Sequence, residues 1–142
     1  MNKLISSTFF FALLVALSFN LKAQDMNTEE IAVKIVQAQL EAYNKQNLEA
    51  FLAVFHEDAA LYNLGDCHPT AQGKEKLREV YGNLFKNSPN LHSKVINRSV
   101  VGNKVFDYEL ITGRNNTDEI YYLMAIYEVV DGKIKNCYFV RQ

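Results

Sequence analysis

Two tight-turn sequences in the last third of the chain constrain its fold more than any other feature. Gly102-Asn103 and Asp131-Gly132 each separate two segments rich in β-branched and aromatic residues. Those segments are residues 95–101, 105–112, 120–130 and 134–140. Such turn residues between β-rich runs are typical of hairpin loops. The sequence therefore predicts two successive antiparallel hairpins.

The chain before residue 91 carries helical periodicity instead. Asn27 and Asn47 can cap two helices, and Gly73 leads into a third that must end before Pro89. The apolar stripes of these helices are Ile31, Ile35, Val36, Leu40 and Tyr43; Leu48, Phe51, Leu52 and Phe55; and Leu77, Val80, Tyr81, Leu84 and Phe85. Residues 56–58 are predicted to end the second helix, and residues 59–64 to form a short strand. Helices first and antiparallel strands after predict the α+β class.

Residues 1–23 have the features of a signal peptide. Lys3 precedes an apolar run over residues 4–19, and Ala23 is a small residue at a plausible cleavage point. The run is shorter than the roughly 20 apolar residues that a membrane-spanning helix needs, which disfavours an uncleaved anchor. We therefore expect an exported bacterial protein, periplasmic or extracellular. Its single domain would cover residues 24–142 and have no membrane contact after cleavage.

Charge and cysteine content exclude several classes of protein. The net charge is −1 and the chain has no basic run, so we expect no nucleic-acid partner. A C-x-x-C pair is absent, which argues against a redox motif or a structural zinc site, and no cofactor is predicted. Cys67 and Cys137 are predicted to be free thiols, although export would permit a disulfide between them.

Several stretches match one superfamily in order and spacing. They are residues 40–44 running into 47–51, then 55–59, 73–79, 89–91, 97–98 and 129–134. On these stretches the chain resembles the nuclear transport factor 2-like superfamily, and within it the SnoaL-like and ketosteroid isomerase-like small proteins. The resemblance implies three N-terminal helices packed on a curved, mainly antiparallel sheet, forming a cone with an internal pocket. It leaves the chemistry open, because one scaffold hosts many functions.

The catalytic residues that this resemblance implies are replaced. The isomerase base falls at Asn63, its second acid at Ala125 and its tyrosine at Gln39. The polyketide cyclases carry an aspartate near Ala125 and a histidine after a Thr-Gly pair, where this chain has Arg114. A general base must be able to accept a proton, which asparagine and alanine cannot do. We therefore expect the pocket to bind a small apolar molecule without the family's chemistry.

Asp107 and Glu109 support the alternative of an isomerase- or cyclase-like enzyme. Strand alternation places both carboxyl groups on one face of the predicted strand. Facing the pocket, they would form an acid/base pair whose pKa values desolvation and like charge would raise. Alternation alone does not fix which face is buried, and we favour the solvent face. We also expect Arg98 to pair with Glu109 across the hairpin.

The predicted pocket combines these acids with residues from the other segments. The candidate ligand-binding residues are Tyr43, Phe55, Asn63, Arg78, Tyr81, Asn97, Asp107, Glu109 and Ala125. His56, Asp66 and His68 suggest a metal site as a weaker alternative. They come from separate segments without a ligand motif, so no metal site is predicted.

Aromatic residues of the last two β-rich segments exceed what one small core needs. They are Tyr121, Tyr122, Tyr127, Tyr138 and Phe139. A surplus of this kind suggests a second buried face. We therefore also consider an interaction module, a homodimer formed through the outer face of the sheet.

Overall fold

The computed structural model describes residues 28–141, so the predicted signal peptide (1–23) and Asn27 lie outside the described residues. The first helix covers residues 28–44 of this range. The other elements are α2 (Leu48–Ala53), β1 (Phe55–Asn63), β2 (Ala71–Gln72), α3 (Lys74–Asn87), β3 (His92–Val101), β4 (Lys104–Thr112), the 3-10 turn η1 (Arg114–Asn116), β5 (Tyr121–Val130) and β6 (Lys133–Arg141). None of the described helices is long and apolar enough to cross a membrane.

The six strands form one sheet in the order β2-β1-β6-β5-β4-β3, and β1 and β6 are its parallel pair. Both predicted hairpins are confirmed. Gly102 (φ 57°) lies in the β3–β4 turn, while Asp131 (φ 50°) and Gly132 (φ 71°) form the β5–β6 turn. The α+β class is also confirmed, with three helices packed on a mainly antiparallel sheet.

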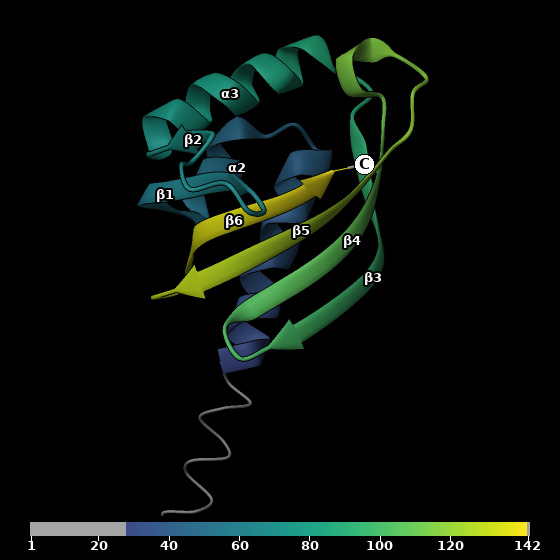
Figure 1. Cartoon of the computed structure of the whole chain (residues 1–142). Coiled ribbons are helices and arrows are strands. Elements are labelled where there is room, and N and C mark those ends of the chain that lie inside the picture. Colours follow the sequence, from purple (N-terminus) through teal and green to yellow (C-terminus); the bar gives the residue numbers. More distant parts are fainter. Residues whose placement is uncertain (1–27, 142) are drawn as a thin grey trace, which may run out of the picture.

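The helices cover one face of the sheet and leave the other uncovered, as Figure 1 shows with β3 to β6 in front. Every second residue of β4 and β5 is buried against the helical layer. The core joins Val36 of the first helix, Phe51 of α2 and Leu77 of α3 to these inward-facing strand residues. Asn44 ties the first helix to the sheet, since its side chain exchanges two hydrogen bonds with the backbone of Ser93, of 2.7 and 2.9 Å.

The second helix is shorter than predicted, and the prediction that residues 56–58 end it was wrong. The helix stops at Ala53, and residues 55–63 form β1. The N–H of Ile134 donates to the carbonyl of Val54, and Phe55 lies opposite Ile134 in the parallel pairing. Pairing with β6, about eighty residues away in the sequence, thus makes Phe55 the first residue of a strand, although it continues the apolar stripe of the helix.

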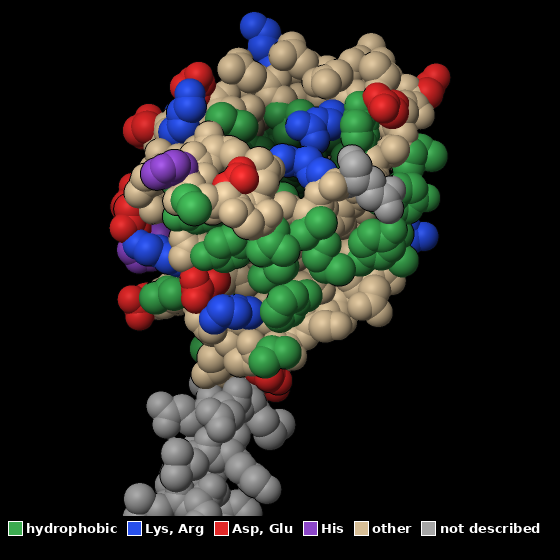
Figure 2. Space-filling view, viewed as in Figure 1, with side chains coloured by type: hydrophobic (Ala, Val, Ile, Leu, Met, Phe, Trp, Pro, Cys, Tyr) green, Lys and Arg blue, Asp and Glu red, His purple; other side chains and the backbone are tan. Residues whose placement is uncertain are grey.

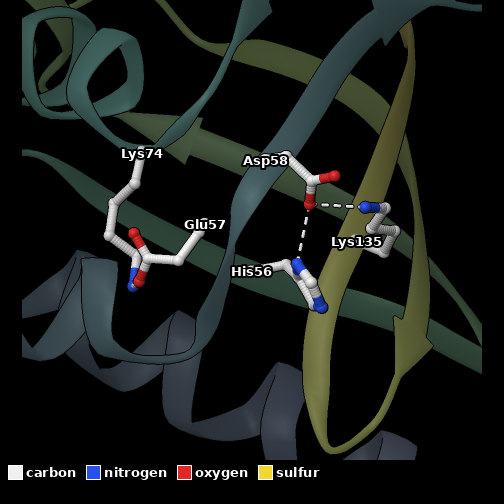
Figure 3. Close-up of polar contacts among 5 residues, drawn as sticks. All are labelled: His56, Glu57, Asp58, Lys74 and Lys135. Atoms are coloured by element: carbon white, nitrogen blue, oxygen red, sulfur yellow. Dashed lines mark hydrogen bonds and ion pairs between the residues drawn. The ribbon is translucent and has the colours of Figure 1, made fainter.

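Polar side chains of the new strand lie in surface ion pairs (Figure 3). His56 Nδ1 is 2.7 Å from Asp58 Oδ1, and Lys135 of β6 also contacts this carboxylate. Lys74 of α3 pairs with Glu57 at 2.5 Å. These contacts are exposed, so they join neighbouring elements without forming a buried site.

The two cysteines are free thiols, as predicted. Cys67 is exposed on the loop after β1, whereas Cys137 is buried on the inner face of β6. Burial raises the pKa of the Cys137 thiol well above its ordinary value. A buried neutral thiol of this kind is a small core residue and not a nucleophile.

Candidate functional site

A cavity of about 190 Å³ lies between the helical layer and the inner face of the sheet. Its walls come from the first helix, the end of β1 with β2, α3, and strands β4, β5 and β6. The lining residues are Gln39, Leu40, Tyr43, Leu61, Thr70, Ala71, Val80, Tyr81, Leu84, Glu109, Ile111, Arg114, Leu123, Tyr127, Phe139 and Arg141. Figure 2 shows a hollow in the molecular surface just below α3, with positively charged side chains in it.

Aromatic packing forms the rear wall of this pocket. Tyr43 and Tyr81 line it, and Phe51 stacks behind them with its ring 4.3 Å from that of Tyr81. Phe85 meets Tyr43 edge to face at 5.6 Å. Burial raises the pKa of both tyrosine hydroxyls, so they stay neutral. The wall is therefore rigid and largely apolar, with two neutral hydroxyl groups.

Glu109 lies in the pocket wall, which corrects the predicted solvent orientation. It is 5% exposed, on the face of β4 that also carries Val105 and Ile111. Ser93 donates a hydrogen bond of 2.7 Å to one carboxylate oxygen, and Tyr127 donates one of 3.0 Å to the other. Desolvation raises the pKa of Glu109, although these two hydrogen bonds oppose the shift.

Asp107 shares the inward face but has a different partner. The prediction that Arg98 pairs with Glu109 was wrong, because Arg98 makes two bonds of 2.7 Å to Asp107. A bulge at Ile96 shifts the β3–β4 register, so that Arg98 lies opposite Asp107 and Val95 opposite Glu109. Asp107 is 1% exposed and does not line the pocket. It is a buried ion-pair partner rather than a free base.

Of the nine candidate ligand-binding residues, the structure brings three together in the lining: Tyr43, Tyr81 and Glu109. The other six lie elsewhere. Phe55 and Ala125 are packed in the core, and Asp107 pairs with Arg98. Asn97 is exposed on β3, Asn63 bonds to Arg141 and Asp66, and Arg78 pairs with Glu49 on the surface.

Sequence reasoning missed two charged residues of the pocket, Arg114 and Arg141. Arg114 follows Thr112-Gly113, where the family resemblance implies a histidine, so the sequence marks this position but does not predict a positive charge in the pocket. Arg141 lies at the end of β6, one residue from the end of the sequence. Its alternation with Phe139 and Cys137 was the available signal for an inward side chain.

No group of three or more metal-ligating side chains occurs among residues 28–141. The three candidate metal ligands lie on different segments. His56 is paired with Asp58 on β1, while Asp66 and His68 lie on the following loop. A resident metal therefore has no ligand set in this part of the chain. What the pocket offers is hydrogen-bonding and charged groups set in an apolar wall.

The sequence pattern of the SnoaL-like domain matches residues 36–137. The chain belongs to the SnoaL-like domain family. This segment contains all the helices and strands that form the pocket, apart from the start of the first helix and the end of β6. No match was found among curated proteins.

Solved structures with the same fold include three with little sequence identity. A cystatin-fold protein from Novosphingobium aromaticivorans is 23% identical, with a TM-score of 0.71 over 78% of this chain and 97% of that one. A nuclear transport factor 2-like protein of unknown function from Cytophaga hutchinsonii is 15% identical (TM-score 0.64; 78% and 89% covered). A Catenulispora acidiphila protein with a ketosteroid isomerase-like fold, in complex with trimethylamine, is 16% identical (TM-score 0.64; 75% and 83% covered). These likenesses establish the fold.

Proposed function

We propose that this SnoaL-like protein is exported and binds a small, mainly apolar molecule in the pocket. The observation that carries the proposal is the cavity of about 190 Å³ whose walls are mostly aliphatic and aromatic side chains. Concave, largely apolar sites with a few placed polar groups are typical of small-molecule sites. The signal-peptide features of residues 1–23 support the exported location.

The cavity volume limits the size of the ligand. An engineered protein cavity of about 150 Å³ binds benzene, so about 190 Å³ suits a molecule with one ring, or a small two-ring system. A four-ring molecule would have to protrude through the mouth. We therefore expect affinity to rise from toluene to indole and to fall for larger ring systems.

Filling the pocket tests this proposal. Leu84 lines the cavity and is half-buried, whereas Leu64 is exposed outside it. We expect indole binding, measured by isothermal titration calorimetry, to be lost in Leu84→Trp and kept in the matched control Leu64→Trp. Circular dichroism checks that both variants fold. Wild-type protein that binds none of the aromatic probes would contradict the proposal.

A second candidate function is proton transfer by Glu109. Asp107 and Glu109 are the two candidate bases predicted from the sequence. Asp107 forms an ion pair with Arg98 and does not line the pocket, so Glu109 is the remaining candidate. Glu109 lines the pocket, and desolvation raises its pKa, which makes the carboxylate a stronger base than an exposed glutamate. The Tyr43 and Tyr81 hydroxyls lie in the same wall.

Isomerisation of cyclohex-3-enone to cyclohex-2-enone tests this chemistry with a substrate of suitable size. An isomerase would accelerate the conversion with wild-type protein, and Glu109→Gln would abolish the acceleration while preserving the shape of the side chain. Equal rates with wild type, Glu109→Gln and buffer would exclude Glu109 as a base for this class of ketone.

A third candidate function is homodimerisation through the uncovered face of the sheet. We define the outer face as the outward side chains Tyr62, Phe106, Tyr108, Leu110, Tyr122, Met124, Ile126, Tyr138 and Val140. Figure 2 shows hydrophobic side chains running across the strands below the hollow. The charged residues Lys104 and Glu128 on the same side of the sheet pair with each other at 3.1 Å. A mainly apolar face can pair with itself about a two-fold axis, which favours a second copy as the partner. Light scattering that finds a monomer at micromolar concentration would exclude this dimer.

A further inference from the structure

The four arginines of this chain fall into two groups. Arg78 and Arg98 form ion pairs, with Glu49 and Asp107 respectively. Arg114 and Arg141 make no ion pair with any carboxylate of residues 28–141, and both line the pocket. They also line the hollow that continues outward from it, so they lie where the pocket meets solvent. Two guanidinium groups without an ion-pair partner in the described part of the chain thus lie at the mouth of a mainly apolar cavity.

The backbone around Arg114 is held in place. Gly113 has a φ of 71°, and a Cβ atom there would lie 2.1 Å from the carbonyl oxygen of Asn90. The N–H of Asn115 donates to the hydroxyl of Ser88, a fully buried residue directly after α3. The guanidinium group itself lies 5.6 Å above the Tyr121 ring. Arg114 is therefore positioned by a close backbone contact and a stacking contact rather than by a carboxylate.

Arg141 is oriented in a similar way. Its strand pairs it with Leu123, another lining residue. One guanidinium nitrogen donates a 2.6 Å hydrogen bond to the side-chain oxygen of Asn63, and the group lies 5.2 Å above the Phe139 ring. Asn63 is neutral and in turn donates a 3.0 Å hydrogen bond to Asp66, so it orients the guanidinium group without a direct ion pair. Arginine presents five N–H donors, most of which remain available to a ligand.

Acidic groups near the pocket form no ion pair with these two arginines among residues 28–141. Glu109 is the one carboxyl group in the lining, and Ser93 and Tyr127 already occupy its two oxygens. Glu119 lines the outer hollow but not the pocket itself, and its carboxylate accepts a hydrogen bond from the Tyr121 hydroxyl. The pocket mouth is thus positive, although the whole chain has a net charge of −1.

We propose that Arg114 and Arg141 bind the carboxylate of the ligand, so that the pocket takes a small aromatic or aliphatic carboxylic acid with its apolar body inside. This inference rests on the proposed binding function and specifies its ligand class. Guanidinium groups match carboxylates with short, charge-assisted hydrogen bonds. The apolar wall accommodates a ring or a short chain, and the two arginines fix which end faces the solvent.

Three probes with the same ring and different charge test the proposal: benzoate, benzyl alcohol and benzylamine. We expect wild-type protein to bind benzoate about tenfold more tightly than benzyl alcohol, and benzylamine most weakly. Arg114→Gln and Arg141→Gln should each weaken benzoate binding about tenfold and change benzyl alcohol binding less than about twofold. Arg78→Gln, which removes the same charge from an ion pair outside the pocket, is the matched control and should alter neither. Titration calorimetry measures all affinities.

Salt dependence gives a readout that needs no variant. Raising sodium chloride from about 20 to 500 mM should weaken benzoate binding and leave benzyl alcohol binding nearly unchanged, because salt screens accessible charges. Equal affinities for benzoate and benzyl alcohol, with no effect of the arginine variants, would overturn the carboxylate inference while the apolar binding function stands. Failure of all three probes to bind would overturn both.

Discussion

Two acids on one strand show how strongly single residues depend on their partners. Asp107 and Glu109 are both buried on the inner face of β4. Asp107 meets a guanidinium group, whereas Glu109 meets only hydroxyl groups and the pocket. Charge compensation therefore makes Asp107 part of the framework, whereas Glu109 has no ion-pair partner among the described residues.

Removing the partner of Asp107 should strongly destabilise the protein. Arg98→Met leaves a nearly fully buried carboxylate without a counter-charge, so we expect a loss of about 3–5 kcal/mol in the free energy of unfolding. Arg78→Met breaks an exposed pair with Glu49, which solvent screens, and should therefore cost much less. Urea denaturation of both variants measures the difference, and similar costs would show that the Arg98–Asp107 pair is unimportant.

Glu109 should give the protein a distinctive pH dependence. Its pKa is raised in the folded state from the ordinary value of about 4.5, so the folded protein keeps this proton to higher pH than the unfolded chain. Stability from this group is complete below the unfolded pKa and is lost as pH rises through the folded pKa. Within that window the loss amounts to at most about 1.4 kcal/mol per pH unit.

Comparison with Glu109→Gln isolates this contribution. The exposed acids Glu49, Glu57 and Asp58, whose pKa values basic partners lower, act in the opposite sense and cancel because both proteins contain them. We expect the stability of wild type relative to Glu109→Gln to fall as pH rises from about 4.5, as measured by urea denaturation at several pH values. A difference that does not change with pH would contradict the raised pKa.

At the scale of elements, the loop between β4 and β5 depends on one glycine. Gly113 has a positive φ and lies against the backbone of Asn90. Gly113→Ala should therefore cost about 3 kcal/mol or more, through the left-handed conformation and the clash together. Gly102→Ala is the matched control, because it has a φ of 57° but no atom within 4 Å of the added Cβ. It should cost about 1–2 kcal/mol, and thermal unfolding compares the two.

Equal costs at the two glycines would mean that the loop relaxes around the added methyl group. Arg114 directly follows Gly113, so such relaxation would also move a residue of the pocket mouth. Calorimetry with benzoate on Gly113→Ala would then report whether the position of Arg114 matters. The element and the site are thus linked through a single backbone contact.

At the scale of the whole molecule, the sheet separates two apolar surfaces. The predicted aromatic surplus divides between them, since Tyr127 and Phe139 face the pocket whereas Tyr122 and Tyr138 belong to the outer face. Tyr138 stacks on Tyr62 at 5.1 Å, and Tyr122 on Tyr108 at 6.0 Å. The outer face therefore contains two stacked tyrosine pairs among its aliphatic side chains.

A charge in the middle of the outer face should prevent the proposed dimer. Met124 lies between Tyr108 and Val140 in the strand register. We expect Met124→Glu to be monomeric by light scattering, because a buried unpaired charge would oppose the contact. Ile31→Glu is the control, since Ile31 is 42% exposed on the first helix, in the layer on the other side of the sheet, and it should leave the oligomeric state unchanged. Equal masses for wild type and Met124→Glu would contradict the dimer.

Turn positions, most helical stripes and the family were predictable from the sequence alone. Turn residues at Gly102 and Gly132 and apolar stripes such as that of Leu77 and Phe85 act over a few neighbours, so they can be recognised without tertiary structure. Alternation likewise showed that Asp107 and Glu109 share a face. These features depend on backbone geometry within one segment.

Contacts between distant segments fix which face of the sheet is covered and which side chains meet. Alternation has a period of two and carries no information on the side where the helices pack. The bulge at Ile96 changed the partner of Arg98, and pairing with β6 turned residues 55–58 from helix into strand. Arg114 precedes β5 and Arg141 ends β6. Because β5 and β6 form an antiparallel hairpin, the two arginines lie at the same end of it, at the pocket mouth. Such convergence depends on contacts between distant segments, which no local pattern specifies.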